Sequence, residues 1–106
     1  MATQGHRGSE AYSAAKAAIM GLTLPMARSV GEHGIRVVSI APGYFDTPIL
    51  KGCDDAFMKR LKSEIAIGKV GEPDDLAHFC MSIVENPYIN GGTLNIDGGI
   101  LKGDMV

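Results

Sequence analysis

The chain opens with a long segment whose apolar residues recur at helical spacing. Residues 9–30 are rich in alanine, the residue that most favours helix. Ser9 can cap the start of this helix, and Gly31 and Gly34 can end it. Pro25 lies inside it, where the missing N–H donor predicts a kink. The small and apolar residues define a narrow face suited to close packing: Ala11, Ala15, Ala18, Leu22 and Met26.

The next segment changes to a strand-like pattern. Residues 35–40 are rich in β-branched side chains, with apolar residues on both faces toward the end, which predicts a largely buried strand. A helix followed directly by such a strand is half of an α/β repeat. Residues 41–48 contain two prolines and a glycine, and they break regular structure at the carboxyl end of that strand. Open α/β sheets bind ligands there, although a simple surface turn fits the same residues.

Two further helices follow. Residues 54–65 predict a helix with aspartates at its positive end, and one apolar side made of Phe57, Met58, Leu61 and Ile65. A mobile lid and a packed surface helix explain this segment equally well. Pro73 opens the third helix. Its apolar residues predict a core-facing side: Leu76, Phe79, Cys80, Ile83 and Val84.

Residues 93–96 predict a short second strand between glycine-containing turns at 90–92 and 97–99. Three helices and two strands in this order predict an α/β fold. Two strands do not make a self-sufficient sheet, and the first is too apolar to be an edge. We therefore expect further structure to cover it.

Length, charge and composition narrow the function classes. The chain has 106 residues, enough for one domain, and its 45% hydrophobic content is typical of globular proteins. A net charge of −2 without a long basic run argues against direct nucleic-acid binding. Residues 1–8 are polar and predict a loop rather than a secretory signal, and no run approaches the roughly 20 apolar residues of a membrane span. We expect a soluble, intracellular protein.

The cysteines and histidines suggest neither a disulfide framework nor a metal site. Cys53 and Cys80 stand alone, which is typical of free thiols in a reducing compartment. His6, His33 and His78 lie far apart, without the spacing of a ligand cluster.

Candidate chemistry lies in the first helix. Tyr12 and Lys16 are four residues apart and therefore share one face of the predicted helix. A free tyrosine has a pKa of about 10, and a nearby ammonium favours the phenolate form. The pair can therefore act as a proton-transfer device, although a solvated helix face carries the same spacing in many proteins.

Three motifs in order resemble one enzyme family. They are Tyr12-x-x-x-Lys16, the Pro-Gly-Tyr-Phe-Asp-Thr run at 42–47, and Asn-Ile-Asp-Gly-Gly at 95–99. This arrangement resembles the C-terminal half of the single Rossmann domain of short-chain dehydrogenase/reductases. Residues 21–28, with the mid-helix proline, and residues 85–91 further resemble type-2 3-hydroxyacyl-CoA dehydrogenases, also known as 17β-hydroxysteroid dehydrogenase type 10.

The resemblance implies roles for the first motif. Tyr12 would be the general acid/base that exchanges a proton with the substrate hydroxyl or carbonyl, and it would also be one of the cofactor-binding residues. Lys16 would activate Tyr12 and hydrogen-bond the nicotinamide ribose. The implied activity is NAD-dependent oxidation or reduction of a secondary alcohol or ketone, of the 3-hydroxyacyl-CoA or hydroxysteroid type, with NADP not excluded.

The second motif would hold the cofactor. Pro42 and Gly43 would let the backbone approach the nicotinamide ring, since glycine has no Cβ. The Phe45 backbone and the Thr47 hydroxyl match positions that hold the carboxamide and the neighbouring phosphate. Residues 48–68 match the family's variable substrate segment. Its basic side chains would meet CoA phosphates or, as we favour, solvent: Lys51, Lys59, Arg60 and Lys62.

The resemblance also implies parts that this chain does not contain. The family's glycine-rich turn and catalytic serine belong before residue 1, and Ser9 and Ser13 have the wrong spacing to replace that serine. We therefore interpret residues 1–106 as the C-terminal half of one Rossmann domain, without the N-terminal cofactor-binding half and inactive alone. The resemblance further implies a mitochondrial homo-oligomer assembled through the 9–30 helix.

Two other interpretations remain open. A truncated, non-catalytic chain would keep only the surfaces used for subunit assembly or other interactions. A small α/β domain unrelated to redox chemistry would carry the three motifs by coincidence.

Overall fold

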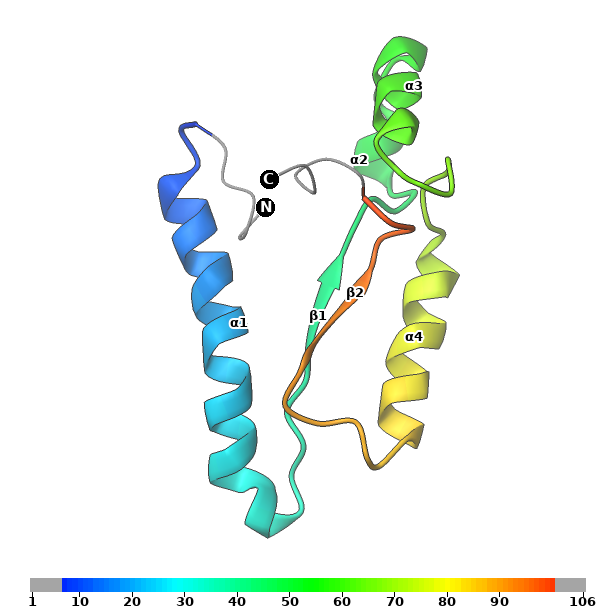
Figure 1. The fold of residues 1–106 in the computed structure, drawn as a ribbon. Coiled ribbons are helices and arrows are strands. Elements are labelled where there is room, and N and C mark those ends of the chain that lie inside the picture. The colour runs from blue at the N-terminus through cyan, green and yellow to red at the C-terminus, as the bar shows by residue number, and fades with distance from the viewer. Residues whose placement is uncertain (1–6, 101–106) are drawn as a thin grey trace. The chain divides into compact units, whose positions relative to one another are not determined.

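The computed structural model describes residues 7–100 and has an α/β architecture. The elements in chain order are α1 (Glu10–Val30), the 3₁₀ turn η1 (Gly31–His33), β1 (Ser39–Pro42), α2 (Pro48–Lys51), α3 (Asp55–Ser63), α4 (Pro73–Glu85) and β2 (Thr93–Ile96). β1 and β2 pair in one sheet and run in the same direction (Figure 1). The predicted fold class is confirmed. Residues 1–6 of the predicted loop at 1–8 lie outside the described residues.

The chain divides into two compact units. Among the described residues, the first comprises 7–40 and 87–94, and so contains α1, η1 and the first residues of each strand. The second comprises 41–86 and 95–100, and so contains α2, α3, α4 and the carboxyl ends of both strands.

The first unit is built on α1, whose predicted extent is confirmed. Ser9 occupies the N-cap position, but its side chain makes no capping hydrogen bond. The helix continues through Pro25, and the Ser29 hydroxyl donates to the Pro25 carbonyl at 3.0 Å. Gly34 follows η1 with a φ of 74°, a left-handed conformation that glycine adopts without steric cost. This residue therefore turns the chain toward β1. The kink at Pro25 stays a prediction.

The face of α1 that packs within the unit differs from the small-residue face expected. Thr23 is 1% exposed and Ala27 is also buried, whereas the predicted face is exposed along its whole length. The periodicity identified a real stripe of small residues, but β1 and the turn before β2 lie against another face. Gly91 approaches this buried face so closely that a Cβ there would lie 3.0 Å from Leu24 and 3.7 Å from the Ala27 methyl.

A chain of hydroxyl groups joins α1 to β1. The Thr23 hydroxyl donates to the Ile19 carbonyl at 2.8 Å and also hydrogen-bonds the Ser39 hydroxyl. Because a threonine hydroxyl has only one proton, Ser39 is the donor in the second bond. A buried polar group without a partner would be costly, so this arrangement fixes α1 against the strand.

The first strand begins later than predicted, at Ser39 rather than at residue 35. The backbone at Val37 pairs with a turn instead of a strand: its N–H donates to the Asn90 side chain at 2.8 Å, and its carbonyl accepts from Gly91 N–H at 2.8 Å. A side-chain amide thus takes the place of a strand partner. The Arg36 guanidinium adds a bond to the Ile89 carbonyl at 3.1 Å. The β-branched content of residues 35–40 predicted a strand there, but it did not predict that Val37 pairs with the turn at Asn90 and Gly91.

In the second unit, α3 and α4 begin within one residue of the predicted helix starts. Asp54 caps α3 by accepting from Phe57 N–H at 2.7 Å, and Glu72 and Asp75 form a reciprocal capping box at the start of α4. α2 is a single turn that opens with Pro48. One turn is too short to show helical periodicity, so the sequence pattern does not reveal this helix.

The core of the second unit is small. α3 ends at Ser63, before the predicted end at residue 65, but Leu61 of α3 and Ile65 beyond it are both buried, as is Ile83 of α4. Val84, which we assigned to the core face of α4, is instead 62% exposed. Leu76, Phe79 and Cys80 are partly buried, so the core face is narrower than the 3–4 pattern predicted.

The carboxyl ends of the strands approach each other at Gly43 and Asp97. Gly43 N–H donates to the Ile96 carbonyl at 2.9 Å, and a Cβ at residue 43 would lie 2.6 Å from the Asp97 Cβ and 2.8 Å from its Cα. The Asp97 carboxylate accepts from Gly99 N–H at 2.8 Å, which fixes the turn after β2. Only a glycine fits at residue 43 while this turn stays in place.

We predict that Thr23→Val lowers the free energy of unfolding by about 1–3 kcal/mol, because it leaves the Ser39 hydroxyl without its buried acceptor. Urea denaturation of the variant and the parent chain measures this loss. Ser29→Ala is the matched control, since it removes an exposed hydroxyl from the same helix and should change the stability by less than about 0.5 kcal/mol. Equal effects of the two substitutions would contradict the assignment.

We predict that Gly43→Ala destabilises the protein by about 1–3 kcal/mol, because backbone rather than a flexible side chain must move away. Gly52→Ala is the control: its Cβ would meet nothing closer than the Ile49 carbonyl at 3.7 Å, and its φ of −83° suits alanine. That variant should stabilise the protein by about 0.4–1 kcal/mol. An unchanged melting temperature of the Gly43→Ala variant would show that the Asp97 turn can move away at little energetic cost.

Candidate functional site

The first group of predicted site residues lies on α1. Lys16 places its Nζ over the Tyr12 ring, 5.3 Å from the ring centroid. Four residues of helix put both side chains on one face, as the spacing predicted. Tyr12 is 49% exposed, and its hydroxyl has no hydrogen-bond partner among the described residues. The phenol is therefore open to a substrate while a positive charge stays beside its ring.

The second group lies directly after β1. Phe45 forms a parallel bridge with Gly71, in which Gly71 N–H donates to the Tyr44 carbonyl at 2.9 Å and Asp46 N–H donates to the Gly71 carbonyl at 2.7 Å. Peptide groups alternate in direction along an extended chain, so the N–H and C=O of Phe45 itself face away from Gly71. Neither has a partner within residues 7–100.

The unpaired groups of Phe45 suit a primary carboxamide. An amide offers both an N–H donor and a carbonyl acceptor, and Phe45 presents the complementary acceptor and donor on one residue. The Phe45 ring lies close to Gly71, where an added Cβ would come within 2.6 Å of the ring Cε1. Gly71 therefore fixes the ring and, through the bridge, the direction of these backbone groups.

Thr47 follows at the N-cap position of α2. Its carbonyl accepts from Lys51 N–H at 3.1 Å, but its hydroxyl makes no capping hydrogen bond. Helix N-cap threonines usually spend the hydroxyl on the first turn. Here that hydroxyl stays available beside the open groups of Phe45, which the sequence alone did not reveal.

The structure contains a reason for glycine at residue 43 that differs from the predicted approach to a nicotinamide ring. Its missing side chain accommodates the Asp97 backbone, as described above, so closeness to a cofactor is not needed to explain glycine at this position. Pro42, the last residue of β1, is exposed. Asp97 and Gly71 support these site residues. Asp97 lies in the 95–99 motif, which assigned it no role, and Gly71 carries no local signal except that it is a glycine in a loop.

The predicted substrate segment at 48–68 ends in a fixed turn. Ala66 N–H donates to the Gly99 carbonyl at 2.6 Å, and Ile67 N–H donates to the Gly98 carbonyl at 3.2 Å. The basic residues of the segment are exposed, and Arg60 lies over the Phe57 ring of its own helix, 5.4 Å from the centroid. These positions agree with the solvent-facing interpretation that we favoured.

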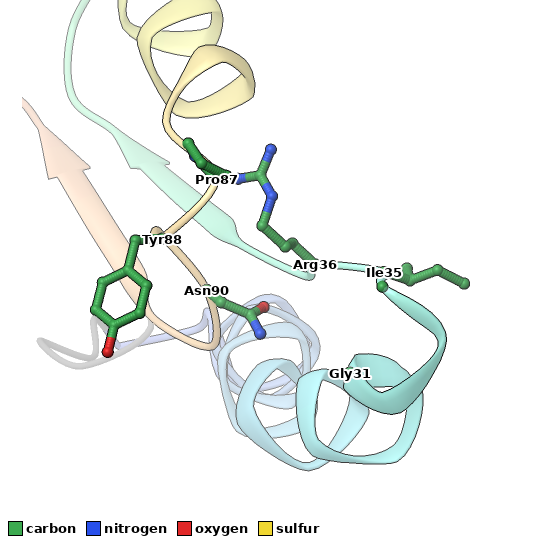
Figure 2. A pocket seen from close by; sticks show the side chains of 7 residues that line it. Gly31, Ile35, Arg36, Pro87, Tyr88 and Asn90 are labelled. Carbon is green, nitrogen blue, oxygen red and sulfur yellow. The ribbon is translucent and has the colours of Figure 1, made fainter.

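A pocket of about 490 Å³ lies in the first unit, away from the tyrosine (Figure 2). Its lining includes Gly31, Ile35, Arg36 and Tyr88 at the carboxyl-terminal end of α1. Gly31 lies nineteen positions after Tyr12, just beyond α1, which corresponds to roughly 28 Å along the helix axis. This pocket therefore does not belong to the Tyr12 site.

Other kinds of site find no support in residues 7–100. No group of three or more histidine, cysteine or acidic side chains in that range is arranged to hold a metal ion. Cys53 and Cys80 are free thiols, both partly buried. None of the helices in the same range is long and apolar enough to cross a membrane.

The site residues thus form two groups, each within its own unit. Tyr12 and Lys16 are in contact on α1. Phe45 and Thr47 present polar groups that have no hydrogen-bond partner among the described residues, on one short segment after β1.

Known proteins are similar to this chain in sequence and in fold. The family model described as enoyl-(acyl carrier protein) reductase matches residues 1–101. The chain is 43% identical over 100 residues to the 3-hydroxyacyl-CoA dehydrogenase type-2 of Rattus norvegicus, a match that covers 93% of this chain and 38% of that protein.

Solved structures agree. A 3-hydroxyacyl-CoA dehydrogenase type-2 from Mycobacterium avium superposes with a TM-score of 0.88 at 36% identity, over 93% of this chain and 39% of that one. A small-chain dehydrogenase in complex with NADPH gives a TM-score of 0.79 at 32% identity, over 96% of this chain and 48% of that one. The chain spans only 38% of the length of the rat relative.

These matches confirm the resemblance to type-2 3-hydroxyacyl-CoA dehydrogenases that the motifs predicted. They also exclude a chance arrangement of three motifs on an unrelated α/β domain, because sequence and fold agree over nearly the whole chain. The chain belongs to the short-chain dehydrogenase/reductase family of oxidoreductases.

Proposed function

We propose that these residues supply the proton-transfer and nicotinamide-holding part of an NAD-dependent oxidoreductase that acts on a secondary alcohol or ketone. The observation that carries the proposal is the Tyr12 phenol, which is open at its hydroxyl and has the Lys16 ammonium over its ring. A general acid/base must reach the substrate oxygen and change its protonation readily. A tyrosine buried in a hydrogen-bond network would not meet the first requirement.

Tyr12 would carry the proton. In the oxidation direction its phenolate oxygen accepts the proton of the substrate hydroxyl, and in the reduction direction its hydroxyl donates a proton to the developing alkoxide. Lys16 would offset the negative charge that Tyr12 holds between these steps, and its ammonium can donate to a ribose hydroxyl. Both roles need only the two side chains that α1 already brings together.

The segment after β1 would hold the cofactor. The N–H and C=O of Phe45 would bind the carboxamide of a nicotinamide, and the Thr47 hydroxyl would donate to the neighbouring phosphate. A bound nicotinamide cofactor supplies hydride transfer. Pro42 and Gly43 complete this segment, with Gly43 held in place by Asp97. The structural neighbour in complex with NADPH supports a nicotinamide cofactor, and the choice of NAD follows the type-2 resemblance.

The substrate would be a 3-hydroxyacyl-CoA or a hydroxysteroid. The support is the similarity to proteins named 3-hydroxyacyl-CoA dehydrogenase type-2. Residues 48–68 would set the preference, with one end held by the turn at 98–99. We further propose that residues 1–106 are the C-terminal half of one Rossmann domain, in which a glycine-rich turn from elsewhere binds the pyrophosphate. By the same resemblance, such an enzyme would act in mitochondria.

We predict that Tyr12→Phe, in the complete protein that contains these residues, lowers kcat for NAD-dependent oxidation of a 3-hydroxyacyl-CoA by about 10²–10⁴-fold. The variant keeps the ring beneath Lys16 and loses only the hydroxyl, so NADH binding measured by calorimetry should change far less than kcat does. Tyr88→Phe is the matched control, because Tyr88 is an exposed tyrosine of the same unit at the far end of α1. Activity of Tyr12→Phe equal to that of Tyr88→Phe would refute the role of Tyr12.

The alternative function, assembly without catalysis, also has an observation in its favour. The small-residue face of α1 is exposed, including Leu22 and Met26, so a second copy of the chain can pack against it. We propose that this face forms a homo-oligomer contact whether or not the protein is catalytic. Absence of both NADH binding and turnover, with association retained, would favour the assembly-only function.

We predict that Ala15→Arg weakens self-association at least roughly tenfold, because a long charged side chain prevents close approach of two helices. Analytical ultracentrifugation over a concentration series measures the dissociation constant. Ala56→Arg, at an exposed position of α3, is the control and should leave that constant unchanged. Unaltered association of the Ala15→Arg variant would place the contact elsewhere.

A further inference from the structure

One dipeptide, Asn90-Gly91, has a reactivity that the proposed function does not use. It lies on the segment between α4 and β2, and Asn90 is exposed there (Figure 2). In an asparagine–glycine pair the backbone nitrogen of the second residue can attack the side-chain amide carbon of the first. Glycine permits this approach because it has no Cβ. The other asparagines lack this feature, since Asn86 precedes a proline without an N–H and Asn95 precedes a β-branched isoleucine.

The reaction requires neither an oxidant nor a cofactor. Gly91 N loses its proton and bonds to Asn90 Cγ, the Cγ–Nδ2 bond breaks, and ammonia leaves. One water molecule then opens the resulting five-membered imide at either carbonyl. The products are aspartate and isoaspartate at residue 90. Overall one water is consumed and one ammonia is released.

Both reacting groups are held by the same residue of the opposite segment. Gly91 N–H donates to the Val37 carbonyl at 2.8 Å, and the Asn90 Oδ1 accepts from Val37 N–H at 2.8 Å. Attack on Cγ requires Gly91 N to leave the first bond and the side-chain amide to turn out of the second. The adjacent bond from Arg36 to the Ile89 carbonyl keeps the preceding residue in place as well. The native pairing therefore opposes the reaction.

We propose that Asn90 is a deamidation site that pairing with Val37 protects, so that it reacts only when this contact opens. Local opening of a folded protein is far less populated than the closed state, which sets the protection. Isoaspartate moves one side-chain carbon into the backbone. Gly91 N–H and the residue-90 side chain can then no longer both reach Val37, and the modified contact does not close again.

The test follows deamidation in the complete protein, incubated at mildly alkaline pH in buffer and in denaturing urea. Peptide mapping by mass spectrometry, with separation of aspartate from isoaspartate, gives the rates at Asn86, Asn90 and Asn95. In urea we expect Asn90 to react at least tenfold faster than the other two. In buffer we expect Asn90 to react at least tenfold more slowly than it does in urea. Equal rates at Asn90 in the two solvents, or no excess over Asn86 and Asn95 in urea, would overturn the proposal.

A second measurement tests whether opening of the Val37 contact controls the reaction. The exchange rate of the Gly91 amide hydrogen reports the breaking of its bond to Val37. Over a series of urea concentrations below the unfolding transition, this exchange rate and the deamidation rate at Asn90 should rise in proportion. A deamidation rate that stays constant while Gly91 exchange accelerates would show that the Val37 contact does not control the reaction.

Discussion

The constraint on which the structure depends is the parallel pairing of β1 with β2. Two bonds fix the register, from Ser39 N–H to the Gly92 carbonyl at 3.1 Å and from Gly43 N–H to the Ile96 carbonyl at 2.9 Å. Residue numbers rise together along both strands, as parallel strands require. The strand pair is so close at its carboxyl end that residue 43 must be glycine. Parallel pairing thereby sets where each following segment begins.

The segment after β1 derives its chemical character from a second close contact. Because Phe45 bridges Gly71, the neighbouring residues 44 and 46 spend their backbone groups on that glycine, and Phe45 keeps its own N–H and C=O unpaired. A rigid donor and acceptor on one residue is a recognition element that costs little entropy to use. Tyr12 and Lys16 likewise need no rearrangement, since helix geometry already puts the ammonium over the ring.

Features that depend on adjacent residues could be predicted from the sequence. The aspartates at the start of α3, the Pro73 helix start and the Tyr12–Lys16 contact all follow from local spacing, and the structure contains each of them. The β2 strand matched its predicted bounds because glycine turns flank it on both sides.

Features that depend on distant partners were predicted less well. Exposure of Val84 and burial of Thr23 are decided by what packs against each helix face, which periodicity does not contain. The late start of β1 follows from the Asn90 side chain, 53 residues away from Val37. The Asp97 turn requires glycine at residue 43, which no local pattern contains, and the approach of Gly43 to a nicotinamide ring stays a prediction.

The central claim is that the segment after β1 binds a nicotinamide carboxamide through Phe45. A titration of the ¹⁵N-labelled complete protein with NADH, followed by amide chemical shifts, tests it most directly. The account predicts a large shift of the Phe45 amide signal and a smaller one at Asp46, whose N–H stays bonded to the Gly71 carbonyl. Shifts confined to the pocket around Arg36 and Tyr88, or none at Phe45 with NADH bound, would contradict it.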